Sequence, residues 1–186
     1  MTTEPTKPSV HEAMARFRAS LVRRASAVAW VILAIVGAQA VRTEVYDDSV
    51  FYVPMIGLVL LVVLSAIARW ERIIAGRGAP WILAGWMLVF ITGVTAMGRV
   101  PELSATAEPV LFGLAAISGL LLVWWTHAFI TVAIGGAVAY LAFTVGEVDA
   151  VPDVLAPVLT VAVVAAATAL VGFELEREMV VSVTRE

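Results

Sequence analysis

Long apolar stretches alternate with short charged segments along the chain. Six stretches of 17 to 20 residues contain no Asp, Glu, Lys or Arg: residues 25–41, 49–68, 80–98, 109–125, 128–145 and 154–173. At a rise of 1.5 Å per residue, each approaches the length needed to cross a ~30 Å hydrocarbon layer. None alternates with the period of two that is typical of a barrel strand. The pattern therefore predicts six transmembrane helices.

The composition agrees with this interpretation. Hydrophobic residues make up 61% of the 186 residues and charged residues 15%, whereas soluble domains contain about 45–50% and about 25%. These proportions exclude a disordered chain and a nucleic-acid-binding module. The expected fold class is all-α: a polytopic membrane protein whose six-helix bundle occupies residues 25–173.

Basic residues divide unequally between the predicted connections. With the N-terminus inside, ten Lys and Arg residues fall on the cytoplasmic side, whereas the external loops hold Arg42 and Arg99. This bias follows the positive-inside rule, and an even number of spans returns the C-terminus to the same side. Eleven Arg against one Lys is typical of a GC-rich bacterial genome. We therefore predict a bacterial inner-membrane protein with both termini in the cytoplasm, and interfacial rings at Trp70, Trp81, Trp124 and Trp125.

A second interpretation concerns the first span. The sequence Ala38-Gln39-Ala40 matches a signal-peptidase site after an apolar run, and cleavage there would leave five spans. The preceding segment of 24 residues is long for a signal peptide, which favours retention of the first helix.

The segment before the first span has helical features. Residues 1–8 are expected to be disordered, and Ser9 with Glu12 forms a capping box that begins an amphipathic helix over residues 9–24. Its apolar stripe consists of Val10, Met14, Phe17 and Leu21. It is interpreted either as an interfacial helix on anionic lipid headgroups or as a docking or dimer-contact helix.

The end of the chain predicts a second cytoplasmic helix. After Gly172 there is no Gly or Pro, so the last span is expected to continue without a break through residues 174–186. Glu174 and Arg177 are three residues apart and are expected to pair. Leu175, Met179 and Val183 follow one side of the same helix. These five residues are the candidate signal-transmitting positions.

This plan resembles the N-terminal membrane region of bacterial sensor histidine kinases and membrane-anchored nucleotide cyclases. The resemblance rests on a basic amphipathic lead-in, six short-looped helices and the Glu174–Glu178 exit segment. It implies that the outgoing helix transmits a movement to a dimeric output domain. The sequence contains no phosphoacceptor His region, ATP-binding glycines or cyclase carboxylates, so the chain is expected to be the sensor part of a longer protein or a stand-alone relative.

Residues that carry chemistry are scarce. There is no Cys, and the two histidines lie outside the predicted spans: His11 near the N-terminus and His127 in a predicted inner loop, where an interfacial role is expected. No charged residue lies inside a span, which argues against a pump or proton-coupled antiporter. We expect no enzyme, cofactor or metal site. Span hydroxyls are expected to bond to carbonyls one turn earlier, whereas Gln39 is a candidate for an outward-facing pocket.

Two classes of function remain. The first is a membrane sensor or anchor module that acts through its cytoplasmic helix as a homodimer, or with a partner membrane or cytoplasmic signalling protein. The alternative is a substrate-binding subunit of a small-molecule transporter, or an accessory subunit of a membrane complex. Small residues four apart, such as Ala115/Gly119 and Ala162/Ala166, predict close helix contacts in either case.

Overall fold

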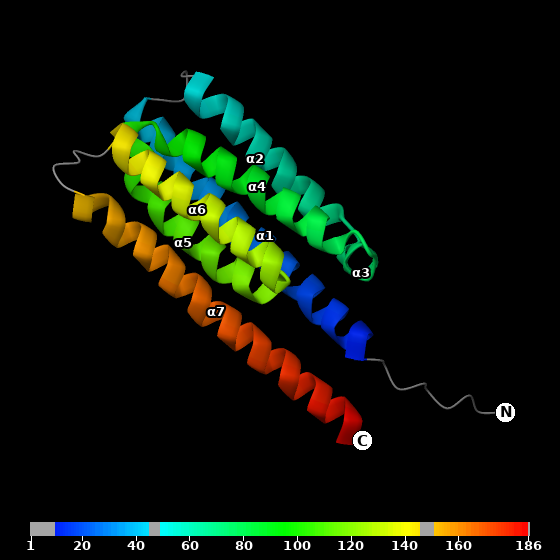
Figure 1. The fold of residues 1–186 in the computed structure, drawn as a ribbon. Coiled ribbons are helices and arrows are strands. Elements are labelled where there is room, and N and C mark those ends of the chain that lie inside the picture. The colour runs from blue at the N-terminus through cyan, green and yellow to red at the C-terminus, as the bar shows by residue number, and fades with distance from the viewer. Residues whose placement is uncertain (1–9, 45–48, 146–150, 186) are drawn as a thin grey trace.

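The computed structural model describes residues 10–44, 49–145 and 151–185, and within these ranges it contains helices and no strand (Figure 1). The helices in chain order are α1 (Val10–Thr43), α2 (Ser49–Ile67), α3 (Trp70–Ile74), α4 (Ala79–Gly98), α5 (Pro101–Leu121), α6 (Trp124–Val145) and α7 (Val151–Arg185). The predicted all-α class is confirmed. The predicted disorder of residues 1–8 concerns a segment outside the described residues.

Five helices, α1, α4, α5, α6 and α7, are long and apolar enough to cross a membrane. The apolar part of α2 within the described residues, Phe51–Ile67, is shorter. At 1.5 Å per residue it extends about 26 Å, against a hydrocarbon layer of ~30 Å. Five of the six predicted spans therefore have the required length, and α2 as a sixth span stays a prediction.

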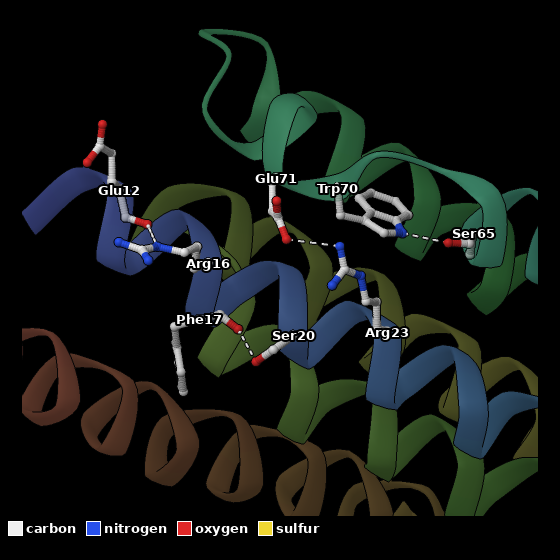
Figure 2. Close-up of polar contacts among 8 residues, drawn as sticks. All are labelled: Glu12, Arg16, Phe17, Ser20, Arg23, Ser65, Trp70 and Glu71. Carbon is white, nitrogen blue, oxygen red and sulfur yellow. Dashed lines mark hydrogen bonds and ion pairs between the residues drawn. The ribbon is translucent and has the colours of Figure 1, made fainter. Parts of the chain in front are cut away.

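The predicted amphipathic helix and the first span form one continuous helix, α1, with no break at residue 24. Met14 is buried, and Leu21 packs on the hydrophobic core. The side chain of Phe17 points toward α7 (Figure 2). Met14, Phe17 and Leu21 of the predicted apolar stripe are therefore directed toward other helices of this chain, and the two interpretations of the segment, an interfacial helix or a docking helix, stay predictions.

Helix α5 begins and ends earlier than the predicted fourth span, 109–125. Helix α5 begins at Pro101, directly after the extended Val100, because proline at the first helical position needs no hydrogen-bonded N–H. It ends at Leu121, since Leu122 is extended (φ −97°, ψ 153°) and buried. Glu102 and Glu108, which precede the predicted fourth span, therefore lie on α5.

The described chain ends lie at the same end of the bundle, together with α3 and the connection between α5 and α6 (Figure 1). We call this the terminal end, and the other the opposite end. The segments at the terminal end carry most of the cations predicted to be cytoplasmic, namely Arg16, Arg18, Arg23, Arg24, Arg69, Arg72, Arg77 and Arg177. Arg42 and Arg99 lie at the opposite end. The predicted separation of charge thus coincides with the two ends of the fold.

Helix α3 is held at the terminal end by polar contacts (Figure 2). Arg23 of α1 pairs with Glu71 of α3 at 3.0 Å, and the indole N–H of Trp70 donates to the carbonyl of Ser65 at 2.7 Å. The indole N–H of Trp86 donates to the Ser65 hydroxyl. Trp70 is therefore buried, and its predicted place at the lipid interface is wrong. Trp81, Trp124 and Trp125 are exposed at this end, as interfacial rings would be.

Helix α7 lies at the side of the bundle and packs on α5 through small residues. A Cβ atom added to Gly119 would overlap the side chain of Thr168 and the backbone of Ala169, and one added to Gly172 would lie 2.7 Å from the Gly119 carbonyl oxygen. Ala115, one turn from Gly119, is completely buried. The predicted close contact at Ala115/Gly119 is confirmed, whereas Ala162 and Ala166 are exposed.

Replacement of Gly119 tests this crossing. Gly119→Leu should lower the free energy of unfolding by about 1–3 kcal/mol, because the new side chain forces two backbones apart. Gly57→Leu is the matched control, since a Cβ atom at Gly57 meets no atom within 4 Å. Chemical denaturation in detergent micelles measures both, and equal loss in the two variants would contradict a close α5–α7 contact.

Candidate functional site

A cavity of about 530 Å³ lies between α5, α6 and α7 at the opposite end of the bundle. Its size is in the range of small-molecule sites, ≈ 300–1,000 Å³. Most lining side chains are apolar, including Phe112 and Leu141, and α7 contributes four residues in its first three turns: Asp153, Ala156, Pro157 and Thr160. A molecule in the cavity would therefore contact α7 directly.

The polar groups of this cavity are carboxylates and hydroxyls. Glu108 of α5 and Asp153 of α7 line it together with Ser104 and Thr160. The Thr160 hydroxyl donates to the carbonyl of Ala156 at 2.9 Å. Within the described residues, no group of three or more His, Asp or Glu side chains is arranged to hold a metal ion. The two carboxylates favour a ligand with a cationic group over an anionic one.

His127 connects the three helices that surround this cavity, closer to the terminal end. It lies in the first turn of α6 and is buried. Its Nδ1 atom is 3.0 Å from the Ser118 hydroxyl of α5, and its Nε2 atom is 3.2 Å from the carbonyl oxygen of Ala165 in α7. The expected interfacial position of His127 is therefore wrong. The predicted end of the fourth span at residue 125 placed His127 in a loop. Its contacts with α5 and α7 could not be predicted from that position.

The partners of the imidazole ring define its proton positions. A carbonyl oxygen accepts and never donates, so Nε2 carries the proton in the contact with Ala165. In a neutral ring Nδ1 then accepts, and the Ser118 hydroxyl donates to it. The same hydroxyl lies 2.8 Å from the carbonyl of Ala115. If the ring is protonated, Nδ1–H donates to Ser118, and the hydroxyl turns to Ala115. A single hydroxyl rotation thus accommodates both states.

Gln39, the candidate for an outer pocket, forms a helix–helix contact. Its Oε1 atom accepts a hydrogen bond of 3.0 Å from the hydroxyl of Thr106 in α5. It is half-buried and is not among the residues that line the described cavities. The structure therefore places Gln39 in the contact between α1 and α5.

The candidate signal-transmitting positions lie on the last part of α7, which continues through Arg185 without a break. The oxygen of Glu174 and the nitrogen of Arg177 are 4.0 Å apart, so the predicted pair is confirmed. Leu175 is half-buried. The side chains of Met179 and Val183 lie outside the described residues.

Comparison with known proteins gives no relative: no protein-family model matches the chain, and no curated protein or solved structure is significantly similar to it.

The His127 contact has a measurable consequence. His127→Ala should reduce the free energy of unfolding by about 1–3 kcal/mol, because it removes a buried group that links α5 and α7. Ser118→Ala should cost less, since the contact of Nε2 with Ala165 remains. Denaturant titration of the two variants in the same detergent gives the comparison. A His127→Ala protein as stable as the wild type would show that the bridge contributes nothing.

Proposed function

We propose that this chain is a membrane sensor or anchor module in which α7 relays a change at the opposite end of the bundle to the terminal end. One observation carries the proposal: α7 lines the 530 Å³ cavity with its first turns and continues as a single helix to Arg185. A rigid helix transmits a shift at one end to the other. The proposal includes a bacterial inner-membrane location, six spans with α2 counted, and cytoplasmic termini.

The contacts along α7 support a relay with three parts. The cavity contacts residues 153–160, the contacts to His127 and Gly119 hold residues 165–172, and the segment from Phe173 onward carries exposed charged and apolar side chains. A ligand in the cavity would displace the first part. The held middle part would then convert that displacement into a tilt or rotation of the last part.

The output of such a relay requires a partner, and a second copy of the chain is the proposed one. Exposed Val180 and Val181 would meet in a parallel pair of α7 helices, and Arg177, one turn earlier on the same face, pairs with Glu174 of its own helix. The chain contains no Cys, so single cysteines can be introduced without background. A downstream or separate signalling domain would be driven by the same movement.

Single-cysteine crosslinking in membranes tests both partner and relay. Cysteines at successive positions from Leu175 to Val183 should form dimers with a repeat of three to four residues. Ala156→Trp, which fills the cavity, should change the crosslinking yield at these positions. The control Ala162→Trp should not, because Ala162 is exposed on α7 and does not line the cavity. The absence of crosslinked dimers at every position would contradict the relay. So would the same crosslinking pattern in the Ala156→Trp and Ala162→Trp proteins.

Orientation is tested separately with alkaline phosphatase fusions, which are active outside the cytoplasm. Fusions after Arg77 and after Glu186 should be inactive, and a fusion after Thr43 should be active. The reverse pattern would place the terminal end outside and remove the proposed cytoplasmic output.

A further inference from the structure

An apolar groove of about 440 Å³ runs between α1 and α5, with α4 beneath it. Along α1 it extends from Ala25 to Ile35, which is about 15 Å, and along α5 from Ala105 to Ile117, about 18 Å, at 1.5 Å per residue. Half of a ~30 Å hydrocarbon layer has the same length. Each of these two walls is therefore about as long as one leaflet is thick. Because Thr106 contacts Gln39, the α5 wall reaches further toward the opposite end than the α1 wall does.

The chemistry of the groove is that of a hydrocarbon chain. Its walls are aliphatic and aromatic side chains, and the hydroxyl of Thr106 is already donated to Gln39. Gly113 contributes to the wall, and a Cβ atom added there would meet no atom within 4 Å. The space beside Gly113 is therefore open to an occupant.

Two arginines, Arg18 and Arg24, lie at the terminal end of the groove. Arg18 lies seven residues before Ala25, and Arg24 lies four residues before Val28, so both are on the groove side of α1. The Nε atom of Arg18 is buried and has no hydrogen-bond partner among the described residues. Arg24 is exposed. The neighbouring Arg23 faces away and is neutralised by Glu71.

The direction of α1 places these cations at the level of lipid headgroups. Side chains on a helix lean toward its N-terminus, and α1 begins at the terminal end. The guanidinium groups of Arg18 and Arg24 therefore extend past the groove, away from its apolar part. Guanidinium groups form strong charge-assisted hydrogen bonds with phosphate oxygens.

We propose that this groove binds one anionic phospholipid of the leaflet at the terminal end, with an acyl chain between α1 and α5 and the phosphate at Arg18 and Arg24. The bound acyl chain covers the apolar walls, and the phosphate neutralises the positive charges of Arg18 and Arg24. The site contains no residue of α7. It is therefore independent of the relay, and each proposal can fail without the other.

Native mass spectrometry tests the site on the full chain. The protein is released from detergent micelles that contain equal amounts of phosphatidylglycerol and phosphatidylcholine. Wild-type protein should retain one phosphatidylglycerol, with a preference of about tenfold over phosphatidylcholine. Arg18→Gln and Arg24→Gln should each reduce this preference several-fold. Arg16→Gln, an equal charge change on another side of α1, should leave it unchanged.

A second part of the experiment fills the groove with a larger side chain. Gly113→Leu should abolish retention of both lipids, whereas Gly136→Leu should not, because Gly136 is on α6 and also has open space around it. Monodisperse elution of both proteins serves as the check on folding. Equal retention of the two lipids by the wild type would overturn the proposal. A Gly113→Leu protein that keeps its lipid would also overturn it. If Gly113→Leu converts a dimer to a monomer without a change in bound lipid, the groove is an interface between copies of the chain, and the proposal is overturned as well.

Discussion

The crossing of α5 and α7 at Gly119 and Gly172 is the contact on which the position of α7 depends. Lipid tails are as apolar as the helix surface, so burial of apolar side chains provides no net drive for helices to associate. Close backbone approach, dispersion contacts and buried hydrogen bonds must hold them. On α7 few side chains are buried, among them Val161 and Ala165, and the small residues opposite Gly119 permit the necessary approach.

Polar side chains in the helices must likewise find hydrogen-bond partners within the protein. Most hydroxyls donate to the carbonyl one turn earlier, as Thr92 does to Leu88 and Ser26 does to Val22. Such bonds give the hydroxyl a partner within its own helix and do not connect one helix to another. Among the described residues, fewer side chains join helices: Gln39 with Thr106, Trp86 and Trp70 with Ser65, Arg23 with Glu71, and His127 with Ser118 and Ala165.

The two ends of the bundle therefore differ in character. The opposite end has a cavity with carboxylates between α5, α6 and α7, whereas the terminal end has the ion pair of α3, exposed tryptophans and most of the arginines. Helix α7 belongs to both ends. The groove between α1 and α5 lies on another side of α5. The proposed relay along α7 and the proposed lipid site at α1 thus use different faces of one bundle, which share Ala105.

Much of this architecture could be predicted from the sequence. Apolar stretches of the right length predict helices because hydrocarbon leaves the backbone no other partners than its own. The absence of Gly and Pro after Gly172 predicted the uninterrupted last helix, and a spacing of three predicted the Glu174–Arg177 pair. These features depend on neighbours along the chain. The unequal distribution of Arg between the two ends could also be predicted, because it depends only on the order of charged and apolar segments along the chain.

The tertiary structure decided which faces meet. The predicted fourth span extends four residues past the end of α5 at Leu121, and this difference hides the contacts of His127, because it places His127 in a loop and not in the first turn of α6. The burial of Trp70 and the partner of Gln39 depend on contacts with other helices, and no local pattern marks them. In a uniformly apolar chain hydrophobicity identifies the helices, but the matching of small and polar side chains between them determines the site, and that matching exists only once the helices are packed.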